Sequence, residues 1–327
     1  MRYIDFHCDT ISRLLPRNPG DPEQRLRSNS LHIDAERLHA AGYAAQFFAM
    51  FLPAAMVPDT LERCLQMVDV FYRSLDDCSD LLAFAGNVQD LDANLATGKV
   101  SAFLTVEDSG IIHGDIALLR VFHRLGLRLV TLTWNFENNV GAPNNTPEMT
   151  ARGLTEHGVD FLRECERLGI IVDVSHLSDA GFWDVAKYST LPFVASHSDS
   201  RAVSSHSRNL TDEMIRALAE KGGVSGLNYW GGLVRPRGGD MYAKFDTEAC
   251  TVDDLARHAR RMIDVGGEDC VALGSDFDGI GTWPEGLDGC HKLDLVTDAF
   301  RRAGLTERQI DKITFGNARR VISEVMK

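Results

Sequence analysis

The stretch Tyr3-Ile4-Asp5-Phe6-His7-Cys8-Asp9-Thr10 joins an apolar run to a His-x-Asp pair. Side chains two residues apart in a β-strand point to the same side, so His7 and Asp9 are predicted to project together while Cys8 points away. An imidazole and a carboxylate that converge on one point are good ligands for a divalent metal such as zinc. The pair alone favours a surface His beside a surface Asp, so a metal site requires further ligands from elsewhere in the chain.

Short apolar or β-branched runs alternate with longer helical patterns along the 327 residues. One such pattern places Leu61, Leu65, Val68 and Tyr72 at the spacing of a single helix face. Alternation of strand and helix predicts a parallel sheet. The predicted strands are residues 2–6, 43–51, 100–106, 127–133, 170–174, 193–196, 223–228 and 271–274.

Eight strand and helix units in a chain of this length predict an α/β fold of the (β/α)8 TIM-type barrel class, formed as one domain over residues 1–327. A doubly wound open sheet is the alternative architecture. No Gly-x-Gly-x-x-Gly motif follows the first predicted strand, which weakens the dinucleotide-binding version of that alternative.

The chain carries a formal net charge of −13 and lacks the basic footprint expected of a nucleic-acid-binding protein. The same charge gives no attraction to anionic membranes, and no stretch is long and apolar enough to span a bilayer. The seven cysteines are scattered and never form Cys-x-x-Cys, a pattern that favours a reducing cytoplasm over a disulfide framework. The sequence therefore predicts a soluble cytoplasmic protein with neither a nucleic-acid nor a membrane partner.

Six side chains with metal-binding or acid–base chemistry stand at or just after the ends of predicted strands. In a barrel, the carboxyl ends of the strands form one mouth, where catalytic residues gather. Three imidazoles and three carboxylates supply enough ligands for two metals, and Glu107 is the natural bridge because a carboxylate has two oxygens. Paired metals polarise a carbonyl and convert bound water to hydroxide near neutral pH. The six residues are His7, Asp9, Glu107, His176, His197 and Asp276.

Each of these residues also has a purely structural interpretation. A lone His after a strand is more often a loop residue or a satisfied core group than a ligand, and an Asp is often the N-cap of the next helix. The capping interpretation applies to Asp9, Asp108 and Asp276. Six such coincidences at one rim would be needed, however, so the metal site is the preferred hypothesis.

Short motifs, in order over almost the whole chain, resemble those of the membrane (renal) dipeptidase family, peptidase family M19 of the amidohydrolase superfamily. Each motif alone is weak, but the set is highly specific. The motifs span residues 5–10, 106–108, 129–133, 173–176, 195–198, 207–209, 222–224, 274–279, 283–287 and 315–317.

The resemblance implies a site for two zinc ions. His7, Asp9 and Glu107 would hold one zinc. Glu107, His176 and His197 would hold the second, so that Glu107 bridges the two ions. The ligand types and the family both favour zinc, although manganese or cobalt also binds to such ligands.

The resemblance also assigns roles to two further side chains. Asp276 would be the acid or base that handles the proton of a metal-bridging water. Arg208 would meet the carboxylate of a dipeptide, a role suited to the bidentate guanidinium fork. Without the resemblance, Arg208 would be interpreted as a solvated loop arginine next to a helix N-cap.

Trp134 departs from the family pattern. In the best-known members, the motif of the fourth strand ends in a His that contacts the substrate and helps to stabilise the tetrahedral intermediate. An indole donates one hydrogen bond but carries no positive charge. Trp134 is therefore predicted to line the substrate pocket without a chemical role. Either Asn135 or a metal takes over the role of the missing histidine, or the rate and the substrate preference differ from those of the best-known members. Simple packing at the rim is the plain alternative.

These observations predict a zinc-dependent dipeptidase in which a metal-bridging hydroxide attacks the peptide carbonyl and Asp276 delivers a proton to the leaving amine. Its expected substrates are small dipeptides, with a D-residue at the carboxyl-terminal side as one option. Two alternatives stay open: an amidohydrolase-type enzyme that acts on another small amide, lactam or ester, and a metal-binding barrel that serves only as an interaction protein. The family also suggests a homodimer.

Overall fold

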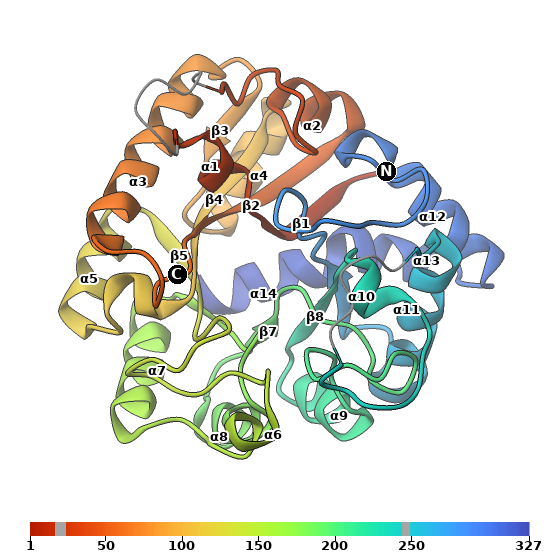
Figure 1. Cartoon of the computed structure of the whole chain (residues 1–327). Helices are drawn as coiled ribbons and strands as arrows, with labels where there is room; N and C mark the ends of the chain where they lie inside the picture. Colours follow the sequence, from red (N-terminus) through yellow and green to blue (C-terminus); the bar gives the residue numbers. More distant parts are fainter. Residues whose placement is uncertain (17–23, 244–248, 327) are drawn as a thin grey trace.

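Eight parallel strands close into a barrel within residues 1–16, 24–243 and 249–326, the part of the chain that the computed structural model describes (Figure 1). Around the ring the order is β2–β1–β9–β8–β7–β6–β5–β4, and β4 pairs with β2 to close it. Helices surround the ring, so the predicted (β/α)8 barrel is confirmed. The barrel strands are β1 (Tyr3–Cys8), β2 (Tyr43–Phe51), β4 (Val100–Glu107), β5 (Leu127–Thr131), β6 (Ile171–Asp173), β7 (Val194–Ala195), β8 (Val224–Leu227) and β9 (Val271–Leu273).

A short additional strand and the helix after it were not predicted from the sequence. Strand β3 (Leu82–Phe84) pairs with the first residues of β4. It lies on the same side of β4 as β5, which pairs with the later residues of β4. Three residues are too few to show a period. Helix α4 (Val88–Ala96) follows and is capped by the Asn87 side chain, which accepts a hydrogen bond from the backbone N–H of Asp90 at 2.9 Å. The pair lies in the long connection between β2 and β4, after helix α3 (Thr60–Asp77).

The described helices lie around the barrel (Figure 1), and none of them combines the length and apolar character that crossing a membrane requires. Besides α4, they are α1 (Thr10–Leu14), α2 (Ala35–Ala41), α3 (Thr60–Asp77), α5 (Ile116–Arg124), α6 (Pro147–Thr150), α7 (Glu156–Leu168), α8 (Asp179–Tyr188), α9 (Asp212–Glu220), α10 (Gly231–Val234), α11 (Val252–Gly266), α12 (Leu293–Arg302), α13 (Glu307–Asp311) and α14 (Asn317–Val325). Short turns of 3₁₀ or π helix occur at Ser109–Ile112, Cys290–Lys292 and Lys312–Gly316.

Apolar side chains from the barrel strands fill the interior of the ring. Phe6, Phe47 and Phe103 belong to this interior cluster, and the rings of Phe47 and Phe103 stack with centroids 4.5 Å apart. Helix α14 adds Val321 and Ile322 to the same cluster, which closes the amino-terminal end of the barrel (Figure 1). The carboxyl end of the barrel is thereby left as the place for a functional site.

An irregularity in β1 turns His7 toward the mouth of the barrel. Phe6 packs inside the barrel and Cys8 in the outer layer, although residues two apart in a regular strand share a face. The pairing of β1 with β2 shifts register between Asp5 and Cys8, which accounts for the reversal. Because the strand ends at Cys8 and Asp9 precedes helix α1, simple strand alternation is not the reason that His7 and Asp9 meet.

Candidate active site

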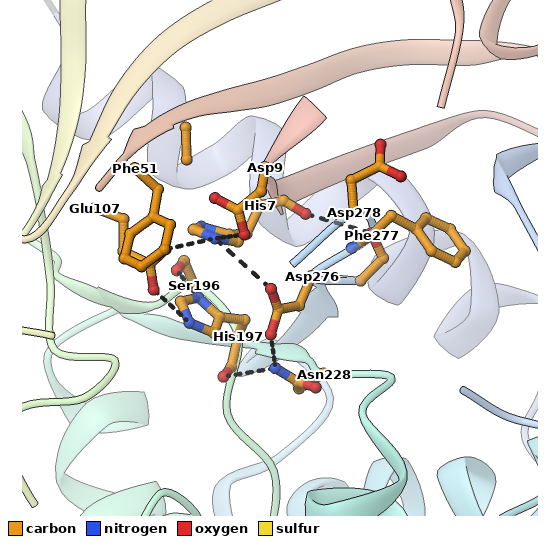
Figure 2. A network of polar contacts seen from close by, with 12 residues as sticks. His7, Asp9, Phe51, Glu107, Ser196, His197, Asn228, Asp276, Phe277 and Asp278 are labelled. Atoms are coloured by element: carbon orange, nitrogen blue, oxygen red, sulfur yellow. Dashed lines mark hydrogen bonds and ion pairs between the residues drawn. The ribbon is translucent and has the colours of Figure 1, made fainter. Parts of the chain in front are cut away.

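The structure brings the six predicted side chains together at the carboxyl end of the barrel, where Figure 2 shows five of them. They stand at or just after the ends of five strands, β1, β4, β6, β7 and β9. All are shielded from solvent, and Asp276, the most exposed, shows 17% of its side chain. The residues are His7, Asp9, Glu107, His176, His197 and Asp276.

Glu107 lies between the histidines. Its Oε2 is 3.5 Å from Nε2 of His7. Its Oε1 is 3.1 Å from Nε2 of His176 and 3.5 Å from Nε2 of His197. Each oxygen of this one carboxylate therefore faces a different group of imidazole nitrogens, the arrangement that a bridging ligand requires.

Two aspartates also lie near Nε2 of His7. Nε2 of His7 is 3.8 Å from Oδ2 of Asp9 and 3.9 Å from Oδ1 of Asp276. By proximity alone, ligand atoms within 4.8 Å of one another form two groups, one of His7, Glu107 and His197 and the other of His7, Asp9 and Asp276. This division differs from the one that the family resemblance implies, because it places Asp276 with the ligands of one group.

Only Asp108, of the three aspartates considered as helix caps, uses its side chain in that way. It accepts a hydrogen bond of 2.8 Å from the backbone N–H of Gly110 at the start of a 3₁₀ turn. Asp9 precedes α1, but its side chain makes no capping hydrogen bond. Asp276 accepts a hydrogen bond from a side chain, that of Asn228. The carboxylates of Asp9 and Asp276 are therefore directed to the site rather than to a helix terminus.

Several buried polar atoms at the centre of the site have no hydrogen-bond partner among the described residues. They include Nε2 of His7, Oδ1 of Asp9 and Nε2 of His197. A buried polar group without a partner costs about 1–3 kcal/mol, so their gathering at one point needs a compensating ligand. Imidazole nitrogens and carboxylate oxygens together fit a divalent cation such as zinc. The residues present therefore fit a bound metal.

Burial and mutual charge shift the proton affinities of the same groups. Burial, followed by the charge of Asp9, raises the pKa of Glu107 to about 8. Burial also raises the pKa of Asp276 to about 6. Burial opposes a charge on His7, yet the Glu107 and Asp9 carboxylates raise the pKa of His7 well above its ordinary value. The buried carboxylates are therefore stable as anions only beside a positive charge. A bound metal supplies that charge when it replaces protons.

Two of the six residues have backbone torsion angles in the left-handed region. The φ angle is 66° at His176 and 60° at Asp276. L-residues rarely adopt such angles, and they persist only where the surroundings impose them. Each residue lies in the turn that follows a short strand, β6 or β9, and this turn directs its side chain to the centre of the barrel mouth.

Arg208 is buried beside the metal ligands and is not a solvated loop arginine. Its Nη1 donates to Oγ of Ser198 at 3.1 Å, and its Nη2 donates to the backbone carbonyl of His197 at 3.3 Å. Only 8% of the residue is exposed, and burial lowers its pKa. The surface interpretation is therefore wrong, and a cation is available at the edge of the site.

Trp134 lies at the rim of a cavity of about 790 Å³, which is also lined by Asp9, Glu107 and Arg208. Its ring centroid is 4.9 Å from that of Phe51 and 6.1 Å from that of His176. The half-buried indole thus belongs to the cavity wall next to the histidine cluster.

Sequence reasoning missed Asn228, which connects two parts of the site. Its Nδ2 donates to Oδ2 of Asp276 at 2.9 Å and lies 3.4 Å from the backbone carbonyl of His197 (Figure 2). Asn228 directly follows β8, so the positional rule that found the other six would also have found it. It was overlooked because an amide is neither a strong metal ligand nor an acid or base.

The family model described as membrane dipeptidase (peptidase family M19) matches residues 1–327. The chain belongs to this family. As a member of peptidase family M19 it is a metallo-dipeptidase, and the prediction of a hydrolase that acts on small peptides and binds a divalent metal is confirmed.

Relatives in the M19 family match this chain over almost its whole length, and the two curated ones are longer than the matched part. An uncharacterized dipeptidase of Schizosaccharomyces pombe is 32% identical, over 98% of this chain and 79% of the relative. A dipeptidase of Claviceps purpurea is 29% identical, over 99% of this chain and 73% of the relative. The crystal structure of a metallo peptidase from Rhodobacter sphaeroides, liganded with a phosphinate mimic of L-Ala-D-Ala, is similar with a TM-score of 0.88 and 29% identity over 99% of both chains.

Proposed function

We propose that this M19 metallo-dipeptidase works with two zinc ions at the mouth of its barrel. The observation that carries the proposal is the placement of Glu107, whose two oxygens face different histidines at 3.1–3.5 Å. One zinc is assigned to His7, Asp9 and Glu107. The second is assigned to Glu107, His176 and His197.

Asp276 is the proposed acid and base. Zinc held by the proposed ligands would supply polarisation of the scissile carbonyl and a water with a lowered pKa. Oδ1 of Asp276 faces the site, while Oδ2 accepts the hydrogen bond from Asn228. With a pKa raised by burial to about 6, this carboxyl is suited to take up a proton and return it to the leaving amine near neutral pH.

Arg208 is proposed to bind the terminal carboxylate of the dipeptide. Its guanidinium has five N–H donors, and the bonds to Ser198 and to the backbone of His197 occupy only part of that set. A bidentate carboxylate would use the remaining donors and offset the burial of the charge. The substrate carboxylate would then lie beside the metal ligands and place the peptide bond over them.

Dipeptides with a D-residue at the carboxyl-terminal side are proposed among the substrates. The support is the Rhodobacter sphaeroides peptidase, whose bound phosphinate mimics L-Ala-D-Ala and whose fold covers 99% of this chain. The cavity of about 790 Å³ also leaves room for side chains larger than methyl groups.

The role of Trp134 supports a second candidate function. It stands where the best-known members carry a histidine, and it lies beside His176 in the cavity wall. We assign Trp134 to substrate binding. Because an indole supplies no positive charge, the same metal site could serve another small amide, a lactam or an ester.

The remaining expectations concern the whole chain and stay predictions. The family match over residues 1–327 supports one domain. Seven free, buried thiols support a reducing compartment such as the cytoplasm. A homodimer is suggested by the family resemblance alone. The net charge of −13 argues against nucleic-acid and membrane partners.

Metal analysis of the purified protein, combined with hydrolysis assays on a mixed L-L and L-D dipeptide panel, tests the proposal. We expect about two zinc ions per chain together with turnover that disappears on chelation and returns with zinc. Dipeptide hydrolysis that survives complete metal removal would overturn it. Two zinc ions without dipeptide turnover, but with hydrolysis of lactams or esters, would favour the second candidate.

A further inference from the structure

A buried chain of hydrogen bonds runs behind His197, on the side away from Glu107. Nδ1 of His197 lies 2.7 Å from Oγ of Ser196 (Figure 2). The same hydroxyl lies 2.5 Å from Oδ2 of Asp173. All three residues are fully buried, so no solvent competes with these contacts.

The direction of each hydrogen bond follows from counting protons. Four donors surround the Asp173 carboxylate: the backbone N–H groups of Ser175 and Ser196, and the hydroxyls of Ser196 and Thr131, at 2.5–2.9 Å. Asp173 therefore acts as an acceptor on both oxygens. Ser196 has a single hydroxyl proton, which it gives to Asp173, so its oxygen accepts from Nδ1–H of His197.

The second ring nitrogen of His197 must then carry a lone pair. A neutral imidazole holds only one proton, and in His197 that proton is on Nδ1. Nε2 of His197 is buried without a hydrogen-bond partner and lies 3.5 Å from Oε1 of Glu107, which is also an acceptor. Two acceptors facing each other are satisfied by a shared cation.

We propose that Asp173, acting through Ser196, is a positioning residue that holds His197 in the tautomer with Nδ1 protonated and thereby sets the affinity of the site for its metal. This inference rests on the proposed function, because it assumes that His197 is a metal ligand. Partners that orient a ligating imidazole in this way typically contribute about 10–100-fold in metal affinity.

The other two histidines of the site are held differently. Nδ1 of His176 contacts the neutral amide oxygen of Asn135 at 3.2 Å. Nδ1 of His7 has no hydrogen-bond partner among the described residues. The carboxylate behind His197 is therefore a specific feature of one ligand, and loss of it should weaken one of the two metals rather than both equally.

Asp173 also connects neighbouring strands, which defines the competing, purely structural explanation. It is the last residue of β6, and its partners Thr131 and Ser196 end β5 and follow β7. Ser196→Ala removes the hydroxyl but keeps the backbone N–H of residue 196, which still donates to Asp173. This variant separates the tautomer effect from the strand connection.

Asp173→Asn is the more informative variant, because it reverses the donor–acceptor direction of the hydrogen bonds to Ser196 and His197 without changing the size of the side chain. Oδ1 of Asp173 faces two backbone N–H groups, which cannot reverse, whereas Oδ2 faces two hydroxyls, which can rotate. The amide nitrogen of the variant would therefore face Ser196. The hydroxyl of Ser196 would then donate to Nδ1 of His197, and the ring proton would move to Nε2, where it opposes a metal.

The test measures zinc and cobalt affinity by chelator competition, the visible spectrum of the cobalt-loaded protein, and thermal unfolding of the metal-free protein. Ser101→Ala is the matched control, because Ser101 is a buried serine of β4 that bonds to Asn94, outside the site. We expect Ser196→Ala to weaken one of the two metals about 10–100-fold, Asp173→Asn to weaken it at least as much, and Ser101→Ala to leave it unchanged.

Two outcomes would overturn the proposal. In the first, the unaltered protein binds two metals and both variants bind them equally tightly. The positioning role of Asp173 and Ser196 is then refuted while the proposed function stands, even if the metal-free variants unfold at lower temperature. In the second, the unaltered protein binds neither zinc nor cobalt. The proposed metal site is then refuted, and so is the positioning role of Asp173 and Ser196.

Discussion

The side-chain nitrogen of Asn228 donates a hydrogen bond of 2.9 Å to Oδ2 of Asp276. The backbone N–H of Trp230 donates to Oδ1 of the same amide at 2.6 Å, which fixes the end of the amide that faces Asp276. Asn228 therefore leaves Oδ1 of Asp276 directed to His7, 3.9 Å away. One neutral side chain thus decides which carboxylate oxygen is available to the site.

Asn228→Ala should lower kcat with little loss of metal. Without the amide, the Asp276 carboxylate can rotate away from the reacting atoms, and a displacement of 1 Å can cost about 100-fold in rate. Steady-state kinetics and metal content, measured on the same preparation, check this expectation. An unchanged kcat in a fully loaded Asn228→Ala protein would show that the hydrogen bond has no part in the reaction.

Asp276→Asn and His176→Ala should separate proton transfer from metal binding. Asp276→Asn should keep the metal and lose turnover by roughly 10²–10⁴-fold, since a positioned acid or base contributes about that much. His176→Ala should lower the metal content instead. Elemental analysis beside the dipeptide assay distinguishes the two variants. Equal loss of metal in both would assign Asp276 to the ligands, as the grouping by proximity does.

Arg208→Lys should raise KM far more than it lowers kcat. Lysine keeps the positive charge but loses the planar fork that matches a carboxylate. The variant should also lose at least one of the two contacts that fix the side chain, those to Ser198 and to the backbone of His197. Comparison of a dipeptide with its carboxyl-terminal amide provides the control. If Arg208 binds the substrate carboxylate, the amide should be a poor substrate of the unaltered protein and should be little affected by the substitution.

Gly279→Ala should disrupt the site through a steric clash with its carboxylates. A methyl group at Gly279 would collide with Oδ2 of Asp9 and Oδ1 of Asp276, so both carboxylates would have to move. We expect reduced metal content and loss of activity in a protein that still folds. Gly238→Ala is the matched control, because a methyl group there meets no atom of the described residues within 4 Å. Equal metal content in the two variants would contradict the described position of the carboxylates.

Glu164 should contribute to stability at neutral pH and not in strong acid. Hydrogen bonds from Arg167, with a further one from Arg120, lower the pKa of Glu164 to about 2. Because the folded value lies below the unfolded value of about 4.5, the contribution is present above that value and is lost as the pH falls toward 2. The side chains of Arg120 and Arg167 are about half exposed, so the contribution should be only about 1 kcal/mol.

Denaturant unfolding of Glu164→Gln at several pH values tests this expectation. The difference in unfolding free energy from the unaltered protein should be present at pH 7 and should shrink below pH 4. The exposed Glu220 provides a control, since Glu220→Gln should give a smaller difference at pH 7. A difference for Glu164→Gln that does not change with pH would mean that packing, rather than charge, is responsible.

The barrel was predictable because parallel strands buried on both faces appear in the sequence as short apolar runs. Strand β2 matches its predicted bounds, residues 43–51, at both ends. Strand β3 was missed because its three residues show no period, and its place is determined by pairing with β4. The reversal of faces within β1 was also missed, since it arises from a shift in register with β2 that the residues themselves do not reveal.

The site was predictable to the extent that it follows from position along a strand. Residue type and a place directly after a strand identified His176, His197 and Asp276 before any contact was known. Asp108 also follows a strand, and the capping interpretation given to it from the sequence agrees with its position at the start of a 3₁₀ turn. Nothing in the sequence distinguishes such a cap from a ligand, because both begin as an Asp after a strand.

Local sequence was therefore sufficient for the eight barrel strands, their order along the chain and the chemistry available at the mouth, but not for strand β3. The contacts that orient this chemistry depend on barrel closure. Asn228 and Asp276 are 48 residues apart, and Asp173 and Ser196 are 23 residues apart. Hydrogen-bond direction, burial and shifted pKa values depend on distances of a few ångströms between such residues, and those distances exist only once parallel strands lie side by side.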